Sequence, residues 1–373
     1  MQYIFFTYNL LTLCRAIRYT DLMYGKDNTT IIYSDFVSEL PTKLQQDYSI
    51  EYVDSHSLNN GINGLQLVMQ TSNITNQIWK VIQRHISTNS NDKVVLIVFR
   101  DNEIQETTWI SRLAKKMGGK AQIWLMEEGA GLYAAKRAPI RYSSIKRLIY
   151  TIKEVSRESL QNYTQGMNPK INKVICTNPD EFRKKRNDLS VDVEKMIDVF
   201  VPEFNNYLID SIDVGNITKS KYDFVFLTQP FHDFKNRYDE LLKTHDELLL
   251  QIFDILSKKG KTVIKLHPRE QYDYAKFQGQ GVDLPGGVEQ QLPFECLMQL
   301  YGNPQMISMF SSTCINVKID KPSIYLGELF NFPVAKELFD VEFYKKNNIF
   351  SCKTLEEFKN IINCEKSGGK ENV

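Results

Sequence analysis

The sequence lacks the patterns that mark several common classes of protein. Its six cysteines form no Cys-x-x-Cys pair and no cysteine and histidine spacing suited to zinc, and a chain of 373 residues needs no disulfides to fold. No stretch approaches the roughly 20 consecutive apolar residues that cross a bilayer. The 46 basic and 45 acidic side chains leave a net charge of +1, so no global field attracts nucleic acid. We therefore expect a cytoplasmic protein that captures any anion locally.

Signatures of several catalytic machineries are missing as well. No Asp-x-Asp pair occurs, and no cluster of histidine and acidic residues has the spacing that suits Mg²⁺, Mn²⁺ or Zn²⁺. Neither a Gly-x-Ser-x-Gly elbow nor a catalytic-cysteine signature is present. These absences disfavour nucleotide-diphosphate transferases that hold their donor through a metal. The sequence predicts no bound metal and no cofactor.

Short apolar runs alternate with helical patterns along the chain, which is typical of parallel sheets covered by helices. We therefore predict an α/β fold. The opening residues 1–17 fit a first strand and helix, because they lack the basic start and the cleavage site of an export signal. The clearest helix covers 234–259 and stops at Gly260. The predicted strands share an apolar run bounded by polar loops: 4–8, 30–33, 93–99, 122–126, 173–176, 222–227, 262–266, 305–310 and 323–326.

A stretch at 201–221 has weak periodicity and contains proline, glycine and several asparagines. We place the domain boundary there and predict two domains, 1–205 and 206–365, followed by a disordered tail at 366–373. A basic amphipathic helix predicted at 143–159 leaves peripheral contact with an anionic membrane open, beside the plainer interpretation as a surface helix. No heptad pattern decides the oligomeric state, so a homodimer also stays open.

Three segments follow predicted strands, where open parallel sheets place ligands. The first contains Glu127, Glu128 and Gly129. Two carboxylates followed by glycine put negative charge where the backbone can approach a ligand closely. A carboxylate here suits a general base better than a phosphate binder. The plain alternative is a solvated acidic turn.

The second segment contains Lys265, His267, Pro268 and Arg269. A histidine at the exit of a buried strand, followed by proline, has a constrained backbone and titrates near neutral pH. Lys265 and Arg269 supply positive potential that would draw a phosphate to this strand end. The alternative is a structural histidine without a ligand.

The third segment contains Ser311 and Ser312, between an apolar strand and a predicted helix at 314–319. Either serine can cap that helix, whose free N–H groups and dipole would then attract an anion. A smaller feature is Glu295, near the start of another predicted helix, which can serve the helix dipole or hold a ribose diol. Plain structural roles without a ligand are the alternative.

Four short motifs occur in the order and approximate spacing of bacterial GT-B sialyltransferases: Glu127-Glu128-Gly129, His267-Pro268, Pro293-Phe294-Glu295 and Ser311-Ser312. The sequence resembles that superfamily, which includes the lipooligosaccharide and capsule sialyltransferases and the bacterial polysialyltransferases. The likeness spans residues 126–314. It implies two Rossmann-like domains facing a cleft, with the acidic motif in the first and the other three motifs in the second.

The resemblance implies a role for each motif residue. Glu128 would deprotonate the acceptor hydroxyl, and His267 would protonate or hydrogen-bond the departing phosphate. Glu295 would hold the ribose of CMP-sialic acid, and Ser311 and Ser312 would hold its phosphate. This donor has a single phosphate, so its leaving group can depart without a metal, in line with the missing Asp-x-Asp. The expected reaction is one displacement with inversion at the anomeric carbon.

Alternatives stay open for the base, the donor and the activity itself. Some sialyltransferase families of this type use an aspartate near the start of the second domain as base, and Asp233 is the candidate here. Kdo transferases share a histidine-proline element, so a Kdo or hexose donor is the alternative to sialic acid. A non-catalytic glycan-binding protein is the alternative to an enzyme. On family grounds the expected acceptor is a galactose-terminated surface glycan, such as capsule or lipooligosaccharide.

Overall fold

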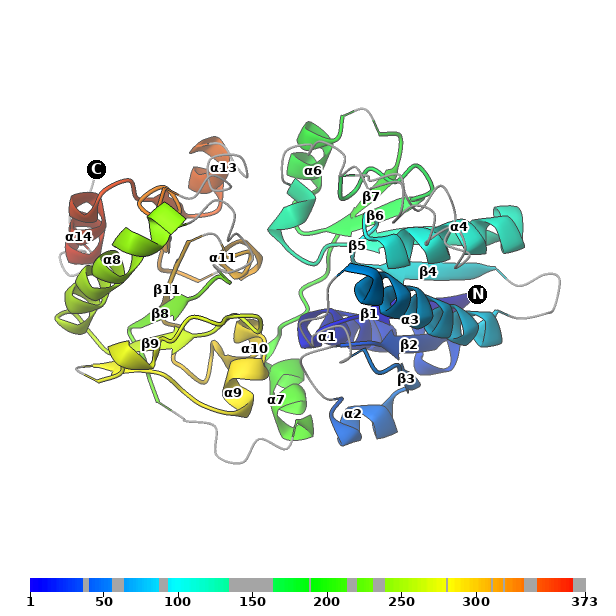
Figure 1. Ribbon diagram of the computed structural model, residues 1–373, viewed down its shortest axis with the longest axis horizontal. Coiled ribbons are helices and arrows are strands. Elements are labelled where there is room, and N and C mark those ends of the chain that lie inside the picture. Colours follow the sequence, from blue (N-terminus) through cyan, green and yellow to red (C-terminus); the bar gives the residue numbers. More distant parts are fainter. Residues whose placement is uncertain are drawn as a thin grey trace. The chain divides into compact units, whose positions relative to one another are not determined.

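The computed structural model divides the chain into two compact units, Met1–Asp213 and Val214–Val373 (Figure 1). The predicted helix at 143–159, Asp233 and the predicted tail at 366–373 lie outside the described residues. The structure describes residues 1–35, 40–55, 64–86, 93–133, 164–187, 189–212, 220–230, 239–279, 281–309, 311–317, 319–331 and 341–364.

Seven parallel strands form the sheet of the first unit, in the order β3-β2-β1-β4-β5-β6-β7. The strands are β1 (Gln2–Thr7), β2 (Thr29–Tyr33), β3 (Ile50–Tyr52), β4 (Val94–Val98), β5 (Ala121–Met126), β6 (Lys173–Cys176) and β7 (Asp192–Lys195). The helices of this unit include α1 (Leu10–Tyr19), α2 (Thr42–Asp47), α3 (Gly64–His85), α4 (Ile104–Met117), α6 (Pro179–Lys185) and α7 (Pro202–Ser211).

Six parallel strands form the sheet of the second unit, in the order β10-β9-β8-β11-β12-β13. The strands are β8 (Phe224–Leu227), β9 (Thr262–Lys265), β10 (Val282–Asp283), β11 (Gln305–Ser308), β12 (Ser323–Tyr325) and β13 (Ile349–Ser351). The helices include α8 (Asp239–Ser257), α9 (Val288–Gln291), α10 (Phe294–Leu297), α11 (Thr313–Asn316), α13 (Val341–Lys346) and α14 (Leu355–Cys364). Among the helices described in both units, none is long and apolar enough to span a membrane.

Both sheets have the same topology. When the strands of each unit are counted along the chain, the order begins 3-2-1-4-5-6 in both, which is the Rossmann arrangement. The order reverses between the first and fourth strands, so the switch point lies between β1 and β4 in one unit and between β8 and β11 in the other. Sheets of this kind bind ligands at the carboxyl ends of the strands beside the switch point.

The central strands are buried on both faces, as parallel sheets between helices require. Every residue of β4, β8, β9 and β11 is buried. In the second unit Phe226, Ile264 and Ile307 belong to one core cluster with Leu249 and Ile252 of α8. This burial explains the continuous apolar runs of the sequence. The α/β prediction is confirmed, and each of the nine predicted strands is present within two residues of its expected ends.

The predicted boundary between residues 205 and 206 falls inside α7. That helix belongs to the first unit, where the Tyr207 hydroxyl donates a hydrogen bond to Oδ2 of Asp47, the last residue of α2, at 2.7 Å. Tyr207 also lies against the Tyr48 ring, with 6.4 Å between ring centroids. The division of the chain therefore follows Asp213.

Candidate functional site

Three strand ends meet beside the switch point of the first unit. Tyr8 and Asn9 follow β1, Arg100 follows β4, and the acidic motif at 127–129 follows β5. Because β1, β4 and β5 are neighbours in the sheet, all of these residues lie at its carboxyl edge. The sequence predicted only the acidic motif at this position.

The first carboxylate of the motif is engaged within the fold. Glu127 is only 1% exposed. Its Oε2 accepts hydrogen bonds from the Tyr133 hydroxyl and, at 2.6 Å, from the backbone N–H of Thr177. Gly129 leads into the short helical turn Ala130–Tyr133, which returns Tyr133 to Glu127. Glu127 thus ties the end of β5 to the residue that follows β6.

The second carboxylate lies in a different environment. Glu128 is half-buried, and its Oε1 accepts a hydrogen bond from Asn9 Nδ2 at 3.1 Å. Asn9 is the N-cap of α1, and its Oδ1 accepts from the backbone N–H of Thr12 at 2.8 Å. Because the cap needs the amide oxygen, the amide NH₂ group must face Glu128. The helix start therefore orients Glu128.

A cation and an aromatic ring complete this edge of the sheet. The guanidinium carbon of Arg100 lies 3.6 Å from the centroid of the Tyr8 ring, and Arg100 Nε lies 3.9 Å from Glu106 Oε1. Burial opposes the charge of Arg100, yet Tyr8, Glu128 and Glu106 hold its pKa above the ordinary value. Burial raises the pKa of Glu106 to about 7, against the effect of Arg100.

His267 follows β9 in the second unit and is half-buried. Its backbone N–H donates to Thr228 Oγ1, at 2.8 Å, which ties it to the residue after β8. Its ring Nδ1 accepts from the backbone N–H of Arg269 at 3.1 Å. Exposed Pro268 lies between these two contacts. Since Nδ1 accepts, the neutral ring carries its proton on Nε2 and is a hydrogen-bond donor there.

Lys265 has a buried structural environment. Its ammonium donates to the backbone carbonyl of Gln290, at 2.6 Å, and to that of Leu266, at 3.2 Å. Burial lowers the pKa of Lys265 to about 8, and the charge of Glu295 opposes that shift. The Gln290 side chain accepts from the Leu266 N–H, at 2.7 Å, and donates to Ile264. Together these groups fix the segment before α10 against the end of β9.

The remaining predicted residues of the second unit form a connected group. Glu295 is 4% exposed, and its Oε1 accepts from the Thr313 hydroxyl at 3.0 Å. Ser311 Oγ accepts from the Thr313 backbone N–H at 3.3 Å, and the Ser311 N–H donates to Ser308 Oγ at 2.9 Å. Ser311 and Ser312 are both half-buried.

The short helix after these serines differs from its prediction. Ser312 is at the N-cap position of α11, but its side chain makes no capping hydrogen bond. The helix has four residues, Thr313–Asn316, where 314–319 was predicted. It therefore offers only a weak dipole, because the macrodipole needs aligned turns. The hydroxyl groups themselves, rather than a long helix, are the polar feature of this strand end.

The structure thus brings the predicted residues together in two separate groups. Glu127, Glu128 and Gly129 belong to the first unit. The other group, in the second unit, follows β9, β11 and the start of α10: Lys265, His267, Pro268, Glu295, Ser311 and Ser312. Within the described ranges, no group of three or more histidine, cysteine or acidic side chains is arranged to hold a metal ion.

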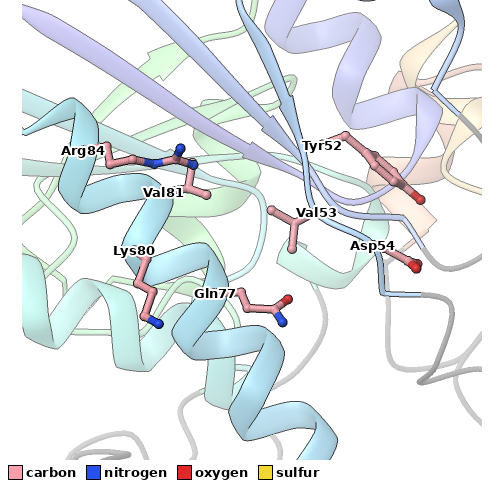
Figure 2. Close-up of a pocket in the computed structure, with 7 residues that line it drawn as sticks. All are labelled: Tyr52, Val53, Asp54, Gln77, Lys80, Val81 and Arg84. Atoms are coloured by element: carbon pink, nitrogen blue, oxygen red, sulfur yellow. The ribbon is translucent and has the colours of Figure 1, made fainter.

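A pocket of about 500 Å³ lies elsewhere in the first unit, between the end of β3 and the C-terminal half of α3 (Figure 2). It is lined by polar and apolar side chains, including Lys80 and Arg84 of α3. Arg84 is paired with Glu51 of β3 at 2.6 Å. The lining includes no member of the acidic motif and none of Tyr8, Asn9 and Arg100.

A model of the Alpha-2,8-polysialyltransferase family matches residues 12–319, more than four fifths of the chain. The chain belongs to this family. It is therefore a glycosyltransferase of the sialyltransferase kind, as the resemblance in the sequence predicted. No curated protein sequence matches it significantly.

Solved structures share the fold of this polysialyltransferase-family chain. One is an alpha/beta-galactoside alpha-2,3-sialyltransferase from Photobacterium phosphoreum, with a TM-score of 0.53, 11% identity, and coverage of 94% of this chain and 98% of that one. Another is a 2,6-sialyltransferase from Photobacterium sp. JT-ISH-224 with CMP and lactose, with a TM-score of 0.52, 10% identity, and coverage of 94% and 78%. TcCGT1 in complex with UDP has a TM-score of 0.51, 10% identity, and coverage of 97% and 90%. The fold is GT-B, as predicted.

Sequence analysis of this family member missed three residues beside Glu128: Tyr8, Asn9 and Arg100. A signal for each was present, because each is a polar side chain within two residues of the end of a buried strand. Their meeting depends on the pairing of β1 with β4. Some 90 residues of sequence separate those strands, so spacing along the chain did not reveal it.

Proposed function

We propose that this chain transfers sialic acid from CMP-sialic acid to a glycan acceptor, with inversion at the anomeric carbon and without a metal. Family membership supports sialyl transfer. The observation that carries the proposal is the contrast between two adjacent carboxylates. Glu127 is buried by its partners, whereas Glu128 is half-buried and oriented by the Asn9 amide at the ligand-binding edge of its sheet. Glu128 is the general base.

The proposed reaction is a single displacement. Glu128 takes the proton of the acceptor hydroxyl while that oxygen forms a bond to the anomeric carbon. The bond from the anomeric carbon to the phosphate oxygen breaks, and CMP leaves with the electron pair. The Nε2–H of His267 donates a hydrogen bond or a proton to the departing phosphate. Its orientation is supported by the hydrogen bond at Nδ1.

The donor contacts are proposed for the second unit. Ser311 and Ser312 offer half-buried hydroxyl groups to the phosphate. Glu295 accepts from the ribose hydroxyl groups, with Thr313 steadying its carboxylate. Lys265 acts from within the fold, since its ammonium holds the Gln290 carbonyl. One phosphate carries little charge, so these donors can stabilise it without a metal clamp.

The acceptor has two candidates. The sequence resemblance suggests a galactose-terminated surface glycan, of capsule or lipooligosaccharide. The matching family is described as alpha-2,8-polysialyltransferase, which supports a sialic acid as the acceptor terminus. We place the reaction in the cytoplasm, where activated sugars are made; membrane contact and a homodimer are further proposals.

A donor and acceptor screen tests this function. Purified protein is incubated with CMP-sialic acid, CMP-Kdo or UDP-hexoses, each with lactose and with sialyllactose, and products are identified by mass spectrometry. We expect transfer from CMP-sialic acid alone, and an anomeric configuration inverted relative to the donor by NMR. Transfer from another donor would replace the proposed substrate. Binding of CMP without any turnover would support the glycan-binding alternative instead.

A further inference from the structure

Arg100 has an unusual setting beside the proposed base. Its guanidinium lies over the Tyr8 ring, with its carbon 3.6 Å from the ring centroid. Its side chain is 31% exposed, so the group is neither deep in the core nor a free surface cation. Its ion pair with Glu106 is long, at 3.9 Å between Nε and Oε1. The aromatic ring holds the guanidinium in place through a cation–π contact before any ligand arrives.

The donors of this guanidinium are not used within the fold. Among the residues that the structure describes, none accepts a hydrogen bond from Arg100, and its buried Nε has only the long ion pair with Glu106. A guanidinium has five N–H donors, and leaving the buried one at Nε unmet costs free energy. Tyr8, Glu128 and Glu106 keep the group charged. A cation held over an aromatic ring, with a buried unmet donor and beside the proposed base, is suited to an anionic ligand.

We propose that Arg100 binds the carboxylate of an acidic sugar at the end of the acceptor, and that it thereby selects an anionic acceptor over a neutral galactose terminus. The planar fork of arginine matches a carboxylate with two parallel hydrogen bonds. Glu128 engages the acceptor hydroxyl at the same sheet edge, so the two contacts orient the terminal sugar. This inference rests on the proposed function and adds a specificity-determining residue to it.

Neutral and charged versions of one acceptor test the proposal on the unmodified enzyme. Sialyllactose is compared with its carboxyl methyl ester and with lactose, by kcat/KM with CMP-sialic acid at saturation. A hydrogen-bonded charge pair is worth about 1.5–3 kcal/mol, so we expect the methyl ester to react about 10- to 100-fold less efficiently. The loss should appear in KM for the acceptor, because the contact exists before the reaction begins.

Variants then assign the effect to one residue. In Arg100→Gln the preference for the acid over its ester should fall to about one, and Arg100→Lys should restore part of it by keeping the charge. Arg112→Gln is a matched control, because Arg112 also lies near an aromatic ring, Trp79, and bonds Asn76 in the same unit. Lys80→Gln removes a cation from the pocket in Figure 2 and controls for net charge. Both controls should keep the wild-type preference.

The outcomes separate the two proposals. If wild-type protein transfers sialic acid but does not distinguish acid from ester, the role of Arg100 is overturned and the proposed function stands. The role of Arg100 is also overturned if Arg100→Gln keeps the preference for the acid over its ester, or if Lys80→Gln abolishes that preference as fully as Arg100→Gln does. If wild-type protein transfers sialic acid to none of the three acceptors, both proposals fail.

Discussion

The adjacent residues Glu127 and Glu128 give the sharpest prediction. The same substitution should lower the stability of the fold at Glu127 and the turnover at Glu128. Glu127 Oε2 accepts two hydrogen bonds inside the fold. Glutamine preserves the shape but removes the charge, and a charge-assisted hydrogen bond is about twice as strong as a neutral one. Losing about 1 kcal/mol from each bond lowers the free energy of unfolding by about 2 kcal/mol. For a unit of this size, Glu127→Gln should lower Tm by about 4–8 °C.

Glu128→Gln should change Tm little, because this side chain is only half-buried and glutamine keeps an oxygen that can accept from Asn9. Its turnover should fall by about 10²- to 10⁴-fold, the usual contribution of a positioned base. Thermal unfolding and CMP-sialic acid turnover are measured on both variants. The reasoning is refuted if Glu127→Gln loses turnover at an unchanged Tm while Glu128→Gln keeps its turnover.

Three further predictions concern other contacts. Asn9→Asp keeps the helix cap but replaces the amide donor with a second carboxylate beside Glu128, so the acidic limb of the kcat/KM pH profile should move to higher pH, and further than in Asn9→Ser, which keeps a cap and only removes the donor. Burial lowers the pKa of His245 from 6.5 to about 4, so the unfolded chain binds its proton first and the protein should lose about 3 kcal/mol of stability as pH falls from 6.5 to 4. The free energy of unfolding is measured by urea titration at pH 7 and pH 4, and His245→Phe should not show the loss at pH 4. A loss in His245→Phe equal to that of the wild type would assign the effect to other groups. Thr313→Val removes the Thr313 hydroxyl from the Glu295 carboxylate and should weaken CMP binding in calorimetry, while Thr313→Ser should restore it; equal binding by both variants would contradict a role for this contact.

The fold was predictable where strands are buried on both faces. The nine predicted strands include all the interior strands of both sheets. The four that were missed are β3, β7, β10 and β13, which are the four edge strands. None of the residues of β7 is buried, and β10 has only two residues. An edge strand is held by one neighbour, so its sequence has little apolar signal to detect.

The site was predictable only in part, for a related reason. The acidic motif and His267 can be recognised in the sequence, because charged or titratable residues directly follow an apolar run. The orientation of Glu128 by Asn9 joins residues 119 positions apart, and no local pattern encodes it. Lys265 seemed suited to phosphate binding because of its charge, yet the structure directs its ammonium to a backbone carbonyl. Tertiary contacts, rather than residue type, decide such assignments.

The most direct test of the central claim is release of CMP from CMP-sialic acid in EDTA, with and without acceptor, by wild-type protein and His267→Ala. His85→Ala is the matched control, since His85 is a partly buried histidine paired with Glu51 in the other unit. We predict acceptor-dependent release by the wild type and the control, and a loss of about 10²- to 10⁴-fold in His267→Ala. Release that requires added metal, or that is equal in His267→Ala and wild type, would contradict the account.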